Sequence, residues 1–176
     1  VKRVLSTDKP VVIDADGLNI LAKHPEYRKL YKGDKLIITP HPGEAARLLN
    51  TEIRRILADP AGRAAALSEK YDCTAVLKGT VTVIKEKNKK PVFAGEPNSG
   101  LAKGGSGDVL AGIISSLLAQ GNSCFTSRVA GVRIHRQAGK ICRTKYTATG
   151  MQAVDLINRL PEVFKIRNNC HRRCKL

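Results

Sequence analysis

Short apolar runs alternate along this chain with longer segments of helical character. The runs are bounded by proline, glycine or acidic residues, as buried strands commonly are. Strands that alternate with helices in this way are typical of an α/β fold built around a parallel sheet. We therefore expect an α/β protein with strands at residues 10–15, 36–39, 74–79, 80–85 and 92–94, the last two forming a hairpin.

Proline and capping residues mark the expected helix boundaries. Asp59 precedes Pro60, which places a favourable N-cap before a proline at the first helical position, and this helix should extend to about Tyr71. The two prolines around His41 exclude a helix at that point. Further helices are expected from residue 17, over 44–49, from the glycine-rich segment to 120, and over 126–143 and 152–160, ended by Pro161.

The length and charge of the chain limit its function. Its 176 residues suit one domain, and 31 lysines and arginines against 15 acidic residues give a net charge of +16. Such a surface attracts polyanions. Four Tyr, three Phe and no Trp leave little for base stacking, so we do not expect specific nucleic-acid binding. We expect neither a membrane span, for which the apolar runs are too short, nor a signal peptide.

The five cysteines are Cys73, Cys124, Cys142, Cys170 and Cys174, an odd number without framework spacing. This usage indicates reduced thiols and a cytoplasmic protein. The segment CHRRC, with His171 between the last two cysteines, offers three ligands without a second pair, which makes a poor zinc site. We interpret it as a solvated tail.

The clearest chemical signal is the segment GGSGD at residues 104–108, which opens a long apolar helix. The first turn of a helix has N–H groups without internal partners, and glycines let that backbone approach a ligand. The segment therefore suits a phosphate, and Asp108 beside it suits a general base for a hydroxyl that attacks phosphorus. Neither a Walker pattern nor a GxGxxG fingerprint is present. A simple glycine turn with Asp108 as a capping acid is the alternative.

Five blocks of sequence extend this signal: VVIDADGLNILA (11–22), ITPHPGEAARLL (38–49), VLKGTVTVI (76–84), AKGGSGDVLAGIISSLLAQG (102–121) and ATGMQAVDLINRLPEVF (148–164). Together they resemble the ADP/ATP-dependent NAD(P)H-hydrate dehydratases of the ribokinase-like superfamily. The resemblance implies a three-layer fold with a mostly parallel sheet flanked by helices. It also implies a domain over residues 1–164 that is incomplete at its N-terminus, and a basic tail over 165–176.

The same resemblance implies a reaction. A member of this family phosphorylates the hydroxyl of NADH or NADPH hydrate and then expels phosphate, which restores the ring double bond. The expected partners are NAD(P)H hydrate and ATP or ADP with Mg²⁺, in a cytoplasmic homo-oligomer. Asp108 would be catalytic and would contact the substrate. The anion hole would be Gly104, Gly105, Ser106 and Gly107; the nucleotide site Lys78, Gly79, Thr80, Val81, Thr82 and Lys103; the substrate site Asn19, His41, Pro42, Gly43, Glu44 and Arg47; and the metal ligand Asp16.

Other interpretations stay open. The chain could be another ribokinase-like kinase, for hydroxyethylthiazole or hydroxymethylpyrimidine, or a non-catalytic fragment that binds polyanions through residues such as Arg136 and Lys140. His41 could be only a turn residue, Lys78 could face solvent, and Asp14 could merely pair with a helix start. His24 and His135 receive no role. Lys103 departs from the resemblance, because that family has a small residue before GGSGD.

Overall fold

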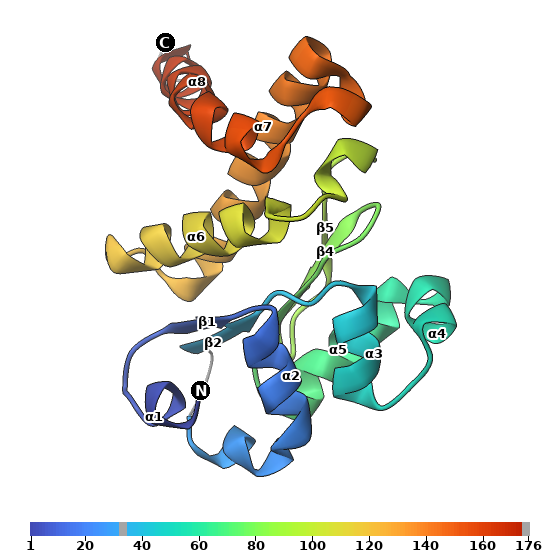
Figure 1. Ribbon diagram of the computed structural model, residues 1–176. Helices are drawn as coiled ribbons and strands as arrows, with labels where there is room; N and C mark the ends of the chain where they lie inside the picture. The colour runs from blue at the N-terminus through green and yellow to red at the C-terminus, as the bar shows by residue number, and fades with distance from the viewer. Residues whose placement is uncertain (32–34, 174–176) are drawn as a thin grey trace.

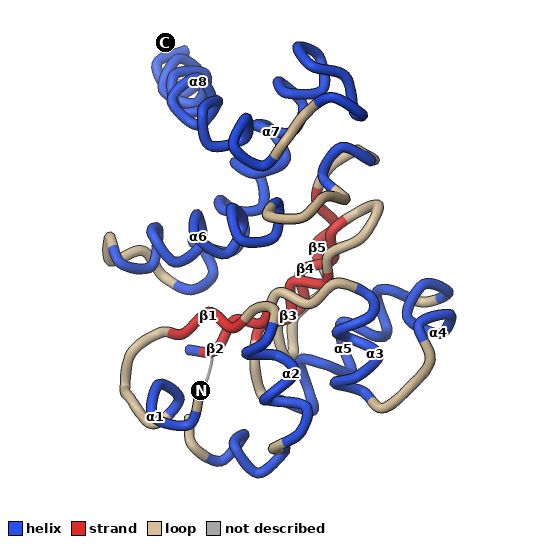
Figure 2. The backbone as a smooth tube through the Cα atoms, in the orientation of Figure 1, coloured by secondary structure: helices blue, strands red, loops and turns tan. Residues whose placement is uncertain are grey.

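The computed structural model describes residues 1–31 and 35–173, and within them helices cover both faces of a five-stranded sheet (Figures 1 and 2). Each expected strand is present. The strands are β1 (Val11–Ile13), β2 (Leu36–Ile38), β3 (Thr74–Leu77), β4 (Thr82–Lys85) and β5 (Val92–Ala94). The helices are α1 (Lys2–Leu5), α2 (Asp16–Lys23), α3 (Pro42–Leu49), α4 (Ile53–Ala58), α5 (Pro60–Tyr71), α6 (Ser106–Ala119), α7 (Cys124–Gly150) and α8 (Ala153–Arg173), with 3₁₀ turns η1 (Pro25–Lys29) and η3 (Ser99–Leu101).

The strands lie in chain order from β1 to β5. β1, β2 and β3 are parallel to one another, with Val12 opposite Ile37. β4 is antiparallel to β3, with Val76 opposite Ile84, and the expected hairpin of β4 and β5 is also antiparallel. The sheet is thus mixed, with parallel pairing confined to its first three strands. The short connections after β3 and β4 explain this, because parallel strands need a crossover of a dozen or more residues.

Alternate side chains of the strands face opposite helical layers, as the pleat of a strand requires. Leu36 and Ile38 belong to the cluster that includes α2 to α5, whereas Ile37 between them packs with α6 and α7. Figure 1 shows the first layer below the sheet and α6, α7 and α8 above it. This confirms the expected three-layer α/β architecture.

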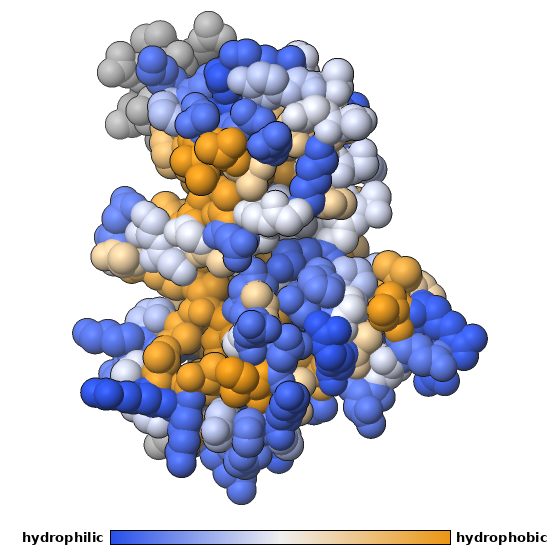
Figure 3. Space-filling model, in the orientation of Figure 1, coloured by the Kyte–Doolittle hydropathy of each residue, from blue (hydrophilic) through white to orange (hydrophobic). Residues whose placement is uncertain are grey.

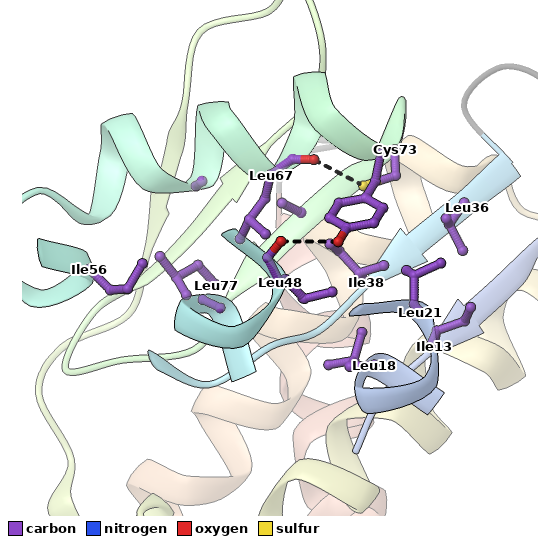
Figure 4. Close-up of a cluster of buried hydrophobic side chains, with 14 of the residues drawn as sticks. Ile13, Leu18, Leu21, Leu36, Ile38, Leu48, Ile56, Leu67, Cys73 and Leu77 are labelled. Carbon is purple, nitrogen blue, oxygen red and sulfur yellow. Dashed lines mark hydrogen bonds between the residues drawn. The ribbon is translucent and has the colours of Figure 1, made fainter. Parts of the chain in front are cut away.

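The lower layer contains the larger cluster of buried side chains (Figure 4). Its few polar atoms are bonded: the Tyr71 hydroxyl donates to the carbonyl of Leu48 at 3.0 Å, and the Cys73 thiol to that of Leu67 at 3.8 Å. Burial raises the pKa of Tyr71 to about 12, so this hydroxyl stays neutral. The cluster gives the carboxyl ends of β1, β2 and β3 a rigid base.

Several helix boundaries differ from the prediction. α3 begins at Pro42 rather than at residue 44, because the first helical position needs no N–H donor. α4 was not predicted, while α5 and its Asp59 cap agree with the sequence. α7 extends beyond residue 143 to Gly150, with a break at Thr147, where φ is 63°.

The prediction that Pro161 ends the last helix is wrong, because α8 continues through it to Arg173. Proline removes one backbone hydrogen bond. On either side of it, however, Leu156 and Val163 are buried in a cluster with α6 and α7, and this packing holds the helix together. The side chains of residues 167–176, and with them the CHRRC segment, lie outside the described part of the structure.

The surface shows where the sheet is open. Within the described residues β1 has one strand neighbour, β2, so its other edge is unpaired. Figure 3 shows apolar side chains gathered in a band that passes this edge. No helix in the described ranges is long and apolar enough to cross a membrane. The thiols of Cys73 and Cys142 are buried.

Candidate active site

We call residues 100–108 the glycine loop; they extend from the 3₁₀ turn η3 into the first turn of α6. Gly105 has a φ of 82°, which is the left-handed region, and α6 starts immediately after it. Val109 N–H donates to the Gly105 carbonyl at 3.1 Å. The N–H groups of Gly107 and Asp108 have no hydrogen-bond partner among the described residues. The loop therefore presents free N–H groups at a helix N-terminus, as an anion cradle requires.

Two glycines of this loop differ in what a side chain at their position would meet. Gly105 adopts a backbone conformation that costs other residues energy, and a Cβ there would lie 2.9 Å from the Cβ of Ala153. A Cβ on Gly107 would lie 3.1 Å from Lys78 Nζ and 3.5 Å from Asp14 Oδ2. These two distances show that the charged side chains of Lys78 and Asp14, at the strand ends, reach the glycine loop.

Lys78 and Asp14 form an ion pair at the carboxyl ends of β3 and β1. Lys78 Nζ lies 2.8 Å from Asp14 Oδ1, and 3.8 Å from an oxygen of Glu44. Asp14 Oδ1 also accepts from Ala15 N–H at 2.9 Å, at the start of α2, and Ala15 has a positive φ of 49°. Lys78 thus points inward rather than to solvent, and Asp14 does more than pair with a helix start. Sequence reasoning undervalued Asp14 beside Asp16.

His41 and Glu44 form a capping box at the start of α3. His41 Nδ1 accepts from Gly43 N–H at 3.0 Å, and Glu44 Oε2 accepts from His41 N–H at 2.7 Å. The side chain of Glu44 is buried while that of His41 is half-exposed. The box fixes His41 at the mouth of the cleft described below, with its Nε2 edge 3.4 Å from Glu44 Oε1.

Arg136, on α7, holds the loop between β3 and β4. Its guanidinium donates to the carbonyls of Gly79 at 3.3 Å and Thr80 at 3.1 Å, and to the Thr82 hydroxyl at 3.2 Å. Burial lowers the pKa of Arg136. The interpretation of Arg136 as part of an exposed basic face is therefore wrong for this residue, since the loop carbonyls occupy its donors.

His135, the neighbour of Arg136, contacts the glycine loop. Its Nε2 lies 3.0 Å from the Ser106 carbonyl oxygen and 3.1 Å from the Ser106 hydroxyl. Burial lowers the pKa of His135 to about 4. The sequence carried a signal for this buried position, because Gly131, His135, Ala138 and Cys142 follow helical spacing along one buried face of α7.

Lys103 is tied to the other end of the glycine loop. Its ammonium donates to the carbonyls of Thr149 and Met151, the latter at 2.8 Å, at the junction of α7 and α8. These contacts occupy donors of the side chain that the sequence assigned to the nucleotide. The same junction supplies Ala153, which packs against Gly105.

These elements enclose a cleft of about 720 Å³. Asp108 lines it with an exposed carboxylate that has no hydrogen bond or ion pair to any described residue. Asp14, His135 and Arg136 also line it, although the sequence gave them no role in the site. The predicted residues that line it are His41, Pro42, Glu44, Lys78, Gly79, Thr80, Thr82, Lys103, Gly105, Ser106, Gly107 and Asp108.

Six predicted residues, namely Asp16, Asn19, Gly43, Arg47, Val81 and Gly104, are not among the cleft-lining ones. Three of them, Asp16, Asn19 and Arg47, form a separate hydrogen-bonded row between α2 and α3. Asn19 accepts from Arg47 Nε at 2.8 Å and donates to Asp16 Oδ1 at 3.2 Å. In the ranges that the structure describes, no group of three or more His, Cys, Asp or Glu side chains could hold a metal.

A second cleft of about 570 Å³ lies between β5 and the helices α7 and α8. It shares Pro97, Asn98 and Arg136 with the first, so the two adjoin. Its other lining residues include the exposed Phe93 and Lys140. Four basic residues of α7 therefore border a hollow rather than a flat face, namely Arg133, Arg136, Lys140 and Arg143.

A family model described as NAD(P)H-hydrate dehydratase matches residues 1–162. The chain belongs to this family. Among its relatives, the ADP-dependent (S)-NAD(P)H-hydrate dehydratase of Neisseria meningitidis serogroup B is 46% identical over 138 residues, which are 78% of this chain and 47% of that protein. The bifunctional NAD(P)H-hydrate repair enzyme Nnr of Escherichia coli K12 is 38% identical over 162 residues, 92% of this chain and 30% of that one.

The family fold agrees with the structure. The ADP/ATP-dependent NAD(P)H-hydrate dehydratase of Bacillus subtilis, co-crystallised with ATP and Mg²⁺, superposes with a TM-score of 0.80 at 31% identity. The match covers 92% of this chain and 56% of that one. A ribokinase-like protein of Enterococcus faecalis gives a TM-score of 0.73 at 26% identity, over 93% and 57% of the two chains. This chain thus spans about half the length of the Neisseria and Bacillus dehydratases and about a third of the Escherichia coli enzyme.

Proposed function

We propose that this protein converts NAD(P)H hydrate to NAD(P)H with ATP or ADP as phosphoryl donor. The observation that supports this most directly is the cleft itself, in which free N–H groups, an unpaired carboxylate and a lysine lie together in a chain of this family. The free N–H groups suit the charge of a transferring phosphoryl group. The carboxylate of Asp108 suits the removal of a proton.

The reaction consists of two balanced steps. In the first, the hydroxyl oxygen of the hydrate attacks the terminal phosphorus, its proton passes to Asp108, and the nucleotide leaves with one phosphate fewer. In the second, the carbon–oxygen bond breaks and its electron pair leaves with phosphate, while the neighbouring ring carbon gives a proton to water and its C–H electron pair forms the new bond. The ring double bond is thereby restored. Phosphate is the better leaving group, which is why a nucleotide is consumed.

The two sides of the cleft suit different parts of this reaction. Lys78 and the loop 79–82, whose carbonyls accept hydrogen bonds from Arg136, border the donor phosphates, as the sequence predicts. His41 and Glu44, at the α3 end, border the hydrate. Lys103 supports the glycine loop through its carbonyl contacts, which we prefer to a direct role at the nucleotide. Asn19, Arg47 and Gly43 would act from behind α3 rather than from the cleft wall.

Mg²⁺ is proposed as the companion of the nucleotide. In the part of the chain that the structure describes, the cleft offers single carboxylates rather than a ligand cluster, which fits an ion held mainly by phosphates and by one or two carboxylates. Asp14, whose carboxylate reaches Gly107, suits that role better than Asp16, which lies outside the cleft lining. When bound, the ion would neutralise phosphate charge.

The setting of the reaction is also a proposal. We infer a cytoplasmic lyase that repairs a soluble cofactor and works as a homo-oligomer, in which a second chain covers the open β1 edge. A related small-molecule kinase would share the first step and would release a phosphorylated product. Only the dehydratase regenerates the absorbance of reduced nicotinamide, so the two activities are separated by one signal.

The test measures that absorbance with the protein, NADH hydrate and Mg²⁺, with ATP and ADP in parallel. We expect a rise that needs nucleotide, and a loss of about a thousandfold in Asp108→Asn, because a general base typically contributes 10²–10⁴-fold. Thermal stability should not change, since the carboxylate has no partner to lose. Wild-type turnover that survives in Asp108→Asn would contradict the mechanism. No rise with either nucleotide would contradict the function of this chain alone.

A further inference from the structure

The contact between His135 and Ser106 indicates which ring nitrogen of His135 is protonated and where the proton of the Ser106 hydroxyl points. Ser106 is the first residue of α6, lines the cleft, and is 3% exposed. A single ring nitrogen, Nε2 of His135, lies within hydrogen-bond distance of both the carbonyl and the hydroxyl of Ser106. The two oxygens differ in what they can do, because a carbonyl only accepts whereas a hydroxyl accepts and donates.

The tautomer of His135 follows from this difference. The ring is neutral at pH 7, because burial lowers its pKa to about 4. A neutral imidazole carries one proton, and the nitrogen that faces a carbonyl must be the one that carries it. His135 is therefore the Nε2–H tautomer.

The state of the Ser106 hydroxyl follows in turn. The Nε2–H group is also directed at the hydroxyl, so the hydroxyl oxygen accepts from His135 and its own proton must point elsewhere. No other hydrogen bond of this hydroxyl is present among the described residues. Ser106 lines the cleft, and a phosphoryl group in the cleft would offer only acceptors.

We propose that His135 is a positioning residue that turns the Ser106 hydroxyl into a hydrogen-bond donor for the transferring phosphoryl group. This inference rests on the proposed function. It adds a side-chain donor to the N–H groups of Gly107 and Asp108, and it explains why a polar pair is buried behind the glycine loop. Without the histidine, no group in the described residues fixes the direction of the hydroxyl proton.

The test is a double-mutant cycle on nucleotide-dependent NADH formation. Ser106→Ala removes the donor, and His135→Leu removes the group that directs it at similar volume. We expect each to lower kcat about tenfold with little change in KM for the nucleotide, and the double variant to be no worse than either. His135→Gln should retain most activity, because its amide N–H can replace Nε2–H. Thermal melting of each variant reports whether it folds.

Two outcomes would overturn the inference. One is a His135→Leu loss that persists in full when Ser106 is alanine, since the histidine would then act by another route. The other is a folded His135→Gln variant as impaired as His135→Leu. A merely structural histidine would lower thermal stability without coupling to the Ser106 hydroxyl in kcat.

A second measurement does not depend on turnover. Long-range ¹H–¹⁵N NMR correlation of the His135 ring at pH 7 should show a neutral ring protonated on Nε2. Addition of ADP should shift these signals in the wild type and much less in Ser106→Ala. A proton on Nδ1, or a charged ring, would overturn the inference. If the wild type forms no NADH, the proposed function fails, and the NMR result still decides the tautomer and its link to Ser106.

Discussion

Two walls of the cleft are built from opposite kinds of interaction. The glycine loop, residues 100–108, is held by hydrogen bonds between uncharged groups and by a lysine on carbonyls, through Ser106, His135 and Lys103. The facing wall, which we call the strand-end wall, is held by the paired charges of Asp14, Glu44 and Lys78 and by the capping box of His41 and Glu44. The first wall therefore keeps its N–H groups free for an anion.

The difference indicates how the site could bind phosphate without losing its shape. The carboxylates of Asp14 and Glu44 on the strand-end wall share the ammonium of Lys78 in the absence of ligand, so each of these charges has a partner of opposite sign. The donors on the glycine loop are backbone groups whose geometry is set by φ and ψ and needs no reorganisation. Variants on each wall should consequently fail in different ways.

The largest effect is expected from Lys78→Met on the strand-end wall. It leaves the carboxylates of Asp14 and Glu44, 11% and 7% exposed, without their cation. Breaking such a pair should cost about 3 kcal/mol of unfolding free energy. Turnover should also fall about a hundredfold, because a cation beside the phosphates is lost. Urea unfolding and NADH formation measure the two losses, with the exposed Lys90→Met as control. Unchanged stability would refute the paired-charge description.

The next effect concerns pH and the glycine-loop wall. The pKa of His135 is lowered from its ordinary 6.5 to about 4, so the unfolded chain binds its proton more readily. The stability that this neutral ring contributes is complete above pH 6.5 and is lost as the pH falls toward 4, by about 3 kcal/mol in total. Urea unfolding at pH 7, 5.5 and 4.5 should show this slope, and His135→Gln should remove it. Equal slopes in both proteins would show that His135 is not the titrating group.

A smaller effect should separate two cations on α7. Arg136→Met frees the loop 79–82, and we expect KM for the nucleotide to rise about tenfold. Lys140→Met should change it little, because the Lys140 side chain is 66% exposed and its Nζ lies 3.9 Å from Glu96. Steady-state kinetics on both variants compare them directly. A polyanion-binding surface would instead respond to both, and would show it as a weaker salt dependence of binding.

The smallest effect should distinguish two adjacent glycines. Gly105→Ala forces alanine into a positive φ and toward Ala153, which should cost about 1 kcal/mol of stability. Gly104→Ala should cost little, because a Cβ there meets nothing within 4 Å. Thermal melting would measure both. Equal losses would mean that the shape of the loop does not depend on the φ of Gly105.

Local patterns predicted much of the fold and part of the site. The strands, the Asp59 cap and the helix that follows GGSGD depend on neighbouring residues, and the structure agrees with them. We expected a mostly parallel sheet, but β3 and β4 are antiparallel. The connection between them is too short for the crossover that a parallel pair needs. The end of α8 was predicted wrongly at Pro161, because the burial of Leu156 and Val163 outweighs the one hydrogen bond that proline removes.

Local patterns could not predict contacts between residues that are distant in the sequence. Lys78 and Asp14 are 64 residues apart, and His135 and Ser106 are 29 apart. Arg136 looked like one more basic residue until the fold placed it on the carbonyls of Gly79 and Thr80. Side-chain type was enough to identify Asp108 and Lys78 as candidates. The residues that hold the site in place could be recognised only from the three-dimensional structure.

The attachment of Lys103 has a consequence for protein synthesis. Its carbonyl partner at Met151 lies 48 residues further along the chain. A ribosome therefore releases the glycine loop well before it makes the segment that holds it. A nascent chain that ends before Thr149 would have all five strands described here and an unsupported loop, so the cleft reaches its final form only once the junction of α7 and α8 has been made.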